Sequence, residues 1–250
     1  MSLAERLTPN KPRVLTVDIE TSPHLCFSYD LWNTNITPDK IVEPSRILCW
    51  AGKWLGESKV MYYGEHTHTR EQMISALWDA LDEADVLITY NGVKFDVPHI
   101  MREFITRDYL PPSPWIDIDL LQVARRRFKF ASNRLGYVTS ALNLPTKLET
   151  GVAQLWLKVL HGDDKAWKKF EAYNKRDVIV TELLYCVLLP WMKAPHAGLW
   201  SGDMSACPSC GSTSLTPTGM TYTKTAAWVK AACDCGAWCK VMANGQTRPI

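Results

Sequence analysis

Four acidic residues and one tyrosine are the side chains of this chain best suited to catalysis: Asp18, Glu20, Asp96, Tyr173 and Asp177. Like charges a few ångströms apart cannot all remain ionised, so several carboxylates gathered in one place need a cation. Carboxylate oxygens are hard ligands that suit Mg²⁺ or Mn²⁺. These residues therefore predict a site where two divalent cations catalyse cleavage of a phosphodiester bond.

The first two acidic residues follow a predicted strand. Residues 13–17 are mostly apolar and β-branched, which is typical of a buried strand. Asp18 and Glu20 are two residues apart, so an extended chain places both side chains on one face of that strand. Two charges on one face are unfavourable in a core and natural at a metal site. A solvated turn is the alternative role for Asp18.

The other candidates belong to predicted helices. Residues 86–89 predict a second buried strand, followed by an Asn-Gly turn and a helix that begins at Asp96. A strand-to-helix junction is where α/β folds usually build their sites, although a simple N-cap is the alternative. Residues 163–189 predict a long helix on which Tyr173 and Asp177, four residues apart, project from one face. For this pair, a core aromatic and an exposed charge are the alternative.

Together these segments resemble the three exonuclease motifs of the DEDD superfamily, the DnaQ-like 3′–5′ exonucleases with a ribonuclease H-like fold. Asp18 and Glu20 match the Asp-x-Glu motif, and residues 91–96 (Asn-Gly-Val-Lys-Phe-Asp) match the second motif. Tyr173 and Asp177 match the Tyr-x-x-x-Asp motif of the DEDDy subclass. Each motif alone is common, but all three in this order, within the expected elements, are specific.

The resemblance extends over about residues 11–192 and includes residues 116–125, similar to the Asp-x-Leu-x-x-Ala-Arg segment of such domains. It implies that Asp18 bridges two Mg²⁺ or Mn²⁺ ions roughly 4 Å apart. Glu20 and Asp177 would complete the ligands of the ion that carries the attacking water. Asp96 is implied to contact the other ion through water. Tyr173 would orient the attacking water rather than act as a free base, because tyrosine titrates at about pH 10.

Cysteines mark a second unit near the C-terminus. Five of the eight lie within residues 207–239, and the pattern Cys-x-x-Cys-Gly followed by Cys-x-Cys-Gly resembles a zinc ribbon. The expected ligands of one structural Zn²⁺ are Cys207, Cys210, Cys233 and Cys235. The usual second pair is Cys-x-x-Cys, so Cys239 is a rival for the fourth position. Disulfides are the alternative, which the odd number of cysteines and the absence of a secretory signal argue against.

A cluster of cations interleaved with aromatics indicates contact with nucleic acid. The expected contact residues are Asn91 of the second motif, Arg125, Arg126, Arg127 and Lys129. A solvated helix end, with its cations near the negative end of the dipole, is the alternative for the cluster. The ribbon segment, with five Lys or Arg against two Asp over residues 193–250, is a candidate nucleic-acid binding or docking module, or a cap on the first unit.

Composition and the expected elements predict an α/β protein. With 250 residues and 46% hydrophobic content, the chain can bury one full-sized core, and its net charge of +2 produces no strong field. We expect a ribonuclease H-like mixed β-sheet flanked by helices in residues 1–192, and a linker and β-rich zinc ribbon in residues 193–250. The expected strands are 13–18, 24–30, 46–63 in two passes, 86–90 and 115–118; the expected helices are 70–84, 96–107, 119–128, 134–142 and 163–189.

Three functions fit these observations. The first is a metal-dependent 3′–5′ exonuclease in DNA replication or repair, acting on DNA with a free 3′ end, with a polymerase or another replication protein as a candidate partner. The second is a 3′–5′ exoribonuclease in RNA processing. The third is a catalytically silent nucleic-acid-binding protein that uses the ribbon. No apolar run could cross a bilayer and no signal peptide is visible, so we expect a cytoplasmic location, in a bacterium or a phage-infected cell.

Overall fold

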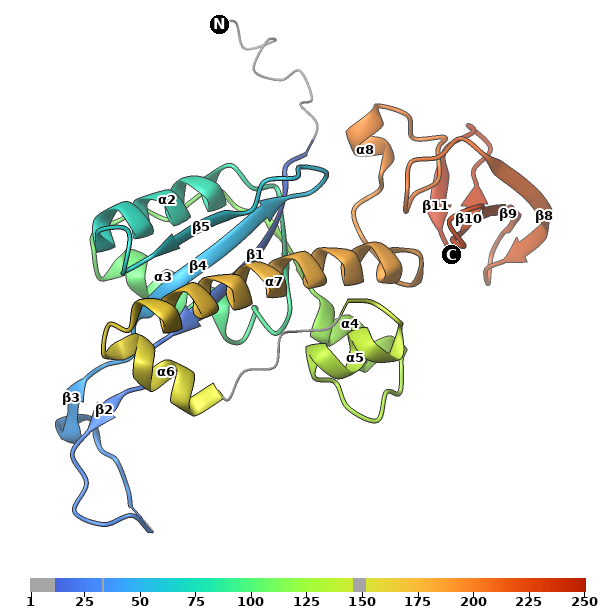
Figure 1. Ribbon diagram of the computed structural model, residues 1–250. Coiled ribbons are helices and arrows are strands. Elements are labelled where there is room, and N and C mark those ends of the chain that lie inside the picture. Colours follow the sequence, from blue (N-terminus) through green and yellow to red (C-terminus); the bar gives the residue numbers. More distant parts are fainter. Residues whose placement is uncertain (1–11, 33, 146–151) are drawn as a thin grey trace, which may run out of the picture.

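The computed structural model describes residues 12–32, 34–145 and 152–250, and a mixed β-sheet lies at its centre (Figure 1). The strands of this sheet are β1 (Val14–Thr21), β4 (Ile47–Trp54), β5 (Met61–Gly64), β6 (Val86–Thr89) and β7 (Ile116–Asp119). Their order across the sheet is β5-β4-β1-β6-β7. β1 is antiparallel to β4, and β4 to β5, whereas β1, β6 and β7 are parallel. The mixed sheet expected from the sequence is confirmed.

Helices cover both faces of this sheet. They are α2 (Arg70–Asp82), α3 (Asp96–Ile105), α4 (Leu120–Arg127), α5 (Leu135–Ala141), α6 (Val152–Leu160) and α7 (Asp164–Leu188). α2 and α3 lie on one face, and the long α7 crosses the other (Figure 1). α7 begins where predicted, because the Asp163 carboxylate accepts a hydrogen bond from the Ala166 amide at 2.8 Å. The five predicted helices are all present, with ends that differ by a few residues.

The alternation of side chains along β1 decides where the first two acidic residues point. Leu15 and Val17 pack into the core cluster beneath α2 and α3. Val14, on the opposite face, packs into the cluster that α7 closes. Asp18 and Glu20 come four and six residues after Val14. Because side chains alternate along a strand, both lie on the same face as Val14 and point toward α7. The prediction that both share one face of a strand is confirmed.

One predicted strand is wrong, and the helix α6 was not predicted. Within residues 24–30 only β2 (Leu25–Cys26) is extended, and it pairs with β3 (Ile41–Glu43) outside the main sheet. Most side chains of this segment are exposed, Tyr29 at 92%, so no core holds one face of a strand there. Between β2 and β3, Asn33 lies outside the described residues, and Pro38–Lys40 forms a short 3-10 helix, η1. α6 had no counterpart among the expected elements.

The C-terminal part of the chain contains a second, antiparallel sheet of order β11-β10-β9-β8. Its strands are β8 (Leu215–Tyr222), β9 (Ala227–Cys233), β10 (Trp238–Val241) and β11 (Thr247–Pro249). The 3-10 helix η2 (Leu189–Trp191) and the short α8 (Gly198–Ser201) connect it to α7. This region is β-rich, as expected. Within the described part of the chain, we find no helix that is long and apolar enough to span a bilayer.

Candidate active site

Three of the predicted catalytic carboxylates lie together between β1 and α7. One carboxylate oxygen from each of Asp18, Glu20 and Asp177 lies within 4.8 Å of the others. Asp18 and Glu20 are half-buried, and Asp177 is buried. These are hard oxygen donors from two packed elements, so the set fits a divalent cation such as Mg²⁺ or Mn²⁺.

Asn174, one turn before Asp177 on α7, holds Asp18 in place. Its side-chain amide donates to the Asp18 carboxylate at 2.7 Å and to the Asp18 backbone carbonyl at 3.1 Å. Asn174 is fully buried. Sequence reasoning did not select this residue, although a polar residue that disfavours helix interiors, directly after Tyr173, was an available signal.

Asp96 contacts the same stretch of β1 but stays outside the group of three carboxylates. Its Oδ1 atom accepts a hydrogen bond of 3.1 Å from the backbone amide of Ile19, the residue between Asp18 and Glu20. Burial raises the pKa of Asp96 to about 7, against the lowering effect of its backbone hydrogen bonds. The alternative N-cap role is wrong, because the helix is capped at Phe95 without a side-chain bond.

A tight turn places Asp96 at this position. Asn91 adopts a left-handed conformation with φ 72°, and its backbone amide donates to the Asp119 carboxylate at 2.9 Å. A Cβ atom on Gly92 would lie only 2.3 Å from the Cβ of Thr89, so only glycine fits there. Asp119, at the carboxyl end of β7, thus anchors the second motif; it lies within the predicted segment 116–125 but was not singled out.

Tyr173 is buried between α7 and the unpredicted α6. The ring of Trp156 meets it edge-on, with centroids 6.0 Å apart and planes at 81°. The indole N–H of Trp156 in turn donates to the Thr21 carbonyl at 3.0 Å, at the end of β1. α6 therefore closes over the end of the strand that carries Asp18 and Glu20, and it fixes the ring of Tyr173.

Cys49, on β4, pairs in register with Glu20 and is fully buried. Burial raises the pKa of its thiol, and the charges of Glu20 and Asp18 raise it further. A neutral, inaccessible thiol is a poor nucleophile, so Cys49 has a packing role. Of the other two cysteines outside residues 207–239, Cys26 is half-buried and Cys186 is exposed.

The basic cluster lies at the end of α4. Arg125, Arg126 and Arg127 form the last turn of the helix, and all three are exposed, as is Lys129. The two aromatics between and after these cations, Phe128 and Phe130, pack against the core cluster of α7. The cations are thus available to a ligand, whereas the phenylalanines contribute to the core.

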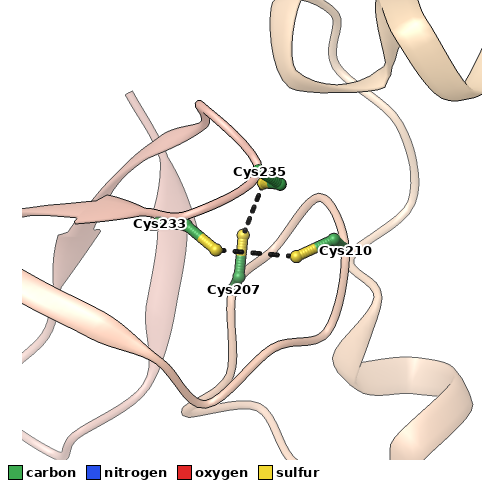
Figure 2. A group of neighbouring side chains, drawn as sticks. All are labelled: Cys207, Cys210, Cys233 and Cys235. Carbon is green, nitrogen blue, oxygen red and sulfur yellow. Dashed lines mark hydrogen bonds between the residues drawn. The ribbon is translucent and has the colours of Figure 1, made fainter.

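The four predicted zinc ligands converge at one end of the C-terminal sheet (Figure 2). The sulfur atoms of Cys207, Cys210, Cys233 and Cys235 lie within 4.8 Å of one another. Gly211, at φ 76°, follows the first pair, and Gly236, at φ 90°, follows the second, so both turns use the positive φ that glycine adopts without strain. Cys239, the rival ligand, lies outside this group and is buried on β10. Four thiolates at this spacing fit a tetrahedral Zn²⁺ site.

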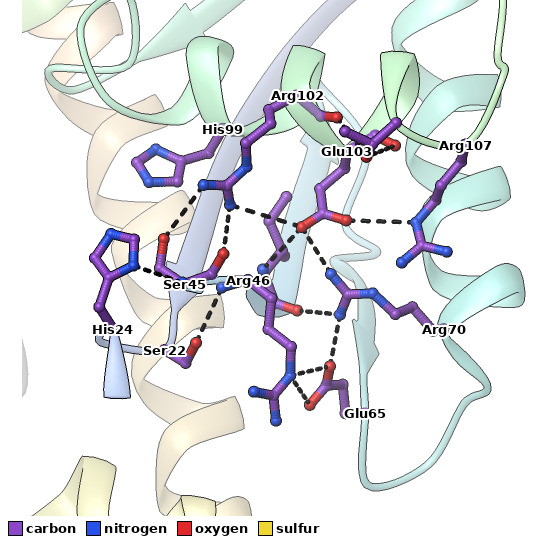
Figure 3. Close-up of polar contacts among 12 residues, drawn as sticks. Ser22, His24, Ser45, Arg46, Glu65, Arg70, His99, Arg102, Glu103 and Arg107 are labelled. Carbon is purple, nitrogen blue, oxygen red and sulfur yellow. Dashed lines mark hydrogen bonds and ion pairs between the residues drawn. The ribbon is translucent and has the colours of Figure 1, made fainter. Parts of the chain in front are cut away.

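A polar network on the other side of the sheet joins β4 to α2 and α3 (Figure 3). The Glu103 carboxylate is buried and accepts from Arg70 at 2.7 Å and from Arg107 at 3.4 Å. Arg70 also donates to the Ile47 carbonyl at 3.0 Å. The Glu103 carboxylate thus neutralises the guanidinium groups of Arg70, at the start of α2, and of Arg107, just after α3, which is a structural role.

We expect Glu103→Gln to lower the free energy of unfolding by about 2 kcal/mol, because it leaves partly buried guanidinium groups without their counter-charge. Urea denaturation followed by circular dichroism measures the change. Glu43→Gln is the matched control, since the Glu43 side chain is 62% exposed and reaches Arg46 only at 3.7 Å; it should cost less than about 0.5 kcal/mol. Equal losses in the two variants would show that the network does not stabilise the fold.

Comparison with known proteins agrees with this architecture. The profile of the RNase H superfamily matches residues 47–189, more than half of the chain. The chain belongs to the RNase H superfamily. The match contains Asp96, Tyr173 and Asp177 but begins after β1, which carries Asp18 and Glu20. The ribonuclease H-like fold class expected from the sequence is confirmed.

A solved structure with a similar fold is the family B DNA polymerase from the hyperthermophilic archaeon Pyrobaculum calidifontis. The two superpose with a TM-score of 0.54 at 15% sequence identity. The aligned region covers 88% of this chain but only 32% of the polymerase chain, so the likeness concerns the fold of one part of that enzyme. No curated protein sequence matches this chain.

Proposed function

We propose that this RNase H superfamily member is a metal-dependent 3′–5′ exonuclease of the DEDDy type that hydrolyses DNA. The observation that carries the proposal is the group of Asp18, Glu20 and Asp177, whose carboxylate oxygens lie within 4.8 Å of one another. Divalent cations bound there would activate the attacking water and stabilise the leaving 3′ oxygen. DNA is proposed as the substrate because one solved structure with a similar fold is a DNA polymerase.

The neighbouring residues have positioning roles in this proposal. Asn174 fixes the Asp18 carboxylate, and Asp96 holds the β1 backbone between Asp18 and Glu20 through the Ile19 amide. Trp156 sets the orientation of the Tyr173 ring. Pre-organised groups of this kind avoid reorganisation during the reaction, which is how charge stabilisation becomes effective in a site.

The C-terminal sheet is proposed to be a zinc ribbon, separated from an exonuclease domain of residues 1–192 by a linker. The proposal rests on the four convergent cysteines and on the left-handed glycine after each pair. Asn91, the three arginines at the end of α4 and Lys129 are proposed to contact the nucleic-acid backbone, since these cations are exposed. A polymerase or another replication protein is the proposed protein partner.

The substrate assay uses one single-stranded sequence as DNA and as RNA, each labelled at the 5′ end, with Mg²⁺ or with Mn²⁺. The proposal predicts a ladder that shortens from the 3′ end on DNA, and no shortening when the 3′ terminus is blocked by an inverted nucleotide. Faster laddering on RNA would make the enzyme an exoribonuclease. Degradation of neither substrate would favour a binding protein.

Tyr173→Phe should lower the cleavage rate by about a hundredfold, because only the hydroxyl that orients the attacking water is lost. Isothermal titration with Mn²⁺ should give unchanged affinity, since the carboxylates remain. Phenylalanine keeps the edge-on contact with Trp156, so the melting temperature should also be unchanged. An unchanged cleavage rate would remove Tyr173 from the mechanism.

A further inference from the structure

A cavity of about 320 Å³ lies between the end of the nuclease fold and the C-terminal sheet. Arg127 at the end of α4, and Trp191 and Lys193 after α7, line one side of it. Lys230 and Trp238, on the adjacent strands β9 and β10, line the other. Among the described residues that line this cavity, none is acidic. The cavity therefore combines cations with aromatic rings on both walls.

Both tryptophans keep an open surface. Trp191 is 62% exposed and Trp238 is 48% exposed. Trp191 is held by an edge-on contact with Phe128, with ring centroids 5.8 Å apart. The ammonium group of Lys230 lies 5.0 Å from the centroid of the Trp238 ring. Large aromatic rings that are fixed, exposed and flanked by cations suit a ligand with planar rings and negative charge.

A second cavity of about 240 Å³ extends this surface along α4. It shares Arg127, Met192 and Lys193 with the first, and its far end is acidic, lined by Asp117 and by Asp119 at the carboxyl end of β7. Asp119 is the residue that anchors the turn before Asp96. The two cavities thus form a groove from the C-terminal sheet toward the edge of the main sheet where the candidate active site lies.

We propose that this groove, lined by Arg127, Trp191, Lys193, Lys230 and Trp238, binds single-stranded nucleic acid. Bases stack on the two tryptophans, and the three cations contact the phosphates between them. A duplex hides its base faces, so single strands are preferred. An acidic protein segment would use the cations but would gain little from the rings. The proposal extends the proposed function to a second site, and its test involves no cleavage.

The test measures the fluorescence anisotropy of a labelled single-stranded DNA of about 20 nucleotides, and of the same sequence as RNA, with the full chain. The buffer contains no added Mg²⁺ or Mn²⁺, which the proposed cleavage requires, and no chelator, so any metal at the cysteines is kept. Trp191→Ala and Trp238→Ala, on opposite walls, should each weaken binding about tenfold. Lys193→Ala should reduce the slope of log K against log salt by about 0.7.

Two matched controls come from the same C-terminal sheet. Tyr222, on β8, is 75% exposed, and Lys224 is exposed in the turn after it; neither lines the cavity. Tyr222→Ala and Lys224→Ala should leave the affinity within about twofold. Unchanged affinity in both tryptophan variants would overturn the proposal, as would equally tight binding of a duplex with the same losses. Weaker binding in the groove variants, with unchanged binding in the controls, would support the groove as a binding site. This conclusion would hold even if the protein cleaves no substrate.

Discussion

Replacing Asp177 by asparagine is expected to lower the rate of DNA cleavage by about a thousandfold, because it removes a fixed charge from the site. The variant should stay folded. Its melting temperature without metal should hold or rise slightly, since the substitution relieves repulsion with Asp18 and Glu20. Single-turnover cleavage of a 5′-labelled oligonucleotide in Mg²⁺ measures the rate, and differential scanning calorimetry measures the stability. Asp18→Ala is expected to abolish cleavage for the same reason, and Asp96→Ala to abolish it because the contact with the Ile19 amide is lost.

Asp164 provides the matched control for this experiment. It is an exposed carboxylate in the first turn of the same helix, α7, and does not belong to the three-carboxylate group. Asp164→Asn should therefore cleave at the wild-type rate. A folded Asp177→Asn variant with wild-type activity would show that Asp177 has no part in catalysis. An Asp177→Asn variant that melts far below wild type would give it a structural role.

Substituting Cys207 by serine is expected to release the zinc and unfold the C-terminal sheet. The purified wild-type protein should contain about one zinc per chain, held by four thiolates. So short a segment buries little apolar surface, so most of its folding free energy must come from the metal. Elemental analysis measures the zinc, and limited proteolysis should cut the variant beyond about residue 200. The RNase H-like part should remain folded.

Cys239 is the natural control, because it is buried nearby on β10 but lies outside the group of four sulfur atoms. Cys239→Ser should keep the zinc. Loss of zinc from that variant, with zinc retained when Cys235 is replaced, would assign the fourth position to Cys239. A wild-type protein without zinc and with protease-resistant residues 207–239 would contradict the metal-dependent ribbon.

The parts of the site that follow from local periodicity could be predicted from the sequence. Asp18 and Glu20 share a face because β-strand side chains alternate, and the spacing of Tyr173 and Asp177 places both on one side of a helix. A capping aspartate, Asp163, marked the start of that helix. The Asn-Gly turn marked the end of β6, because Gly92 is the only residue that fits against Thr89.

The parts that depend on distant contacts could not be predicted in this way. Asn174 acquires its role only because α7 lies across β1 and brings its amide to Asp18. Trp156 contacts the end of β1 only because α6 packs over that end of the strand. The segment 24–30 contains β-forming residues, such as Tyr29, but most of its side chains are exposed, so propensity alone suggested a longer strand than the two residues of β2.

The most direct test of the proposed mechanism is to locate divalent cations on the three carboxylates. Crystals grown with Mn²⁺, measured near the manganese absorption edge, should show anomalous density in contact with Asp18, Glu20 and Asp177, and the density should disappear in Asp177→Asn. A second peak that also contacts Asp18 would complete the two-metal site that the proposed mechanism requires. The contrary result is a protein that degrades DNA from the 3′ end while its crystals show no manganese density at these carboxylates. That result would contradict the proposal that these three carboxylates bind the catalytic cations.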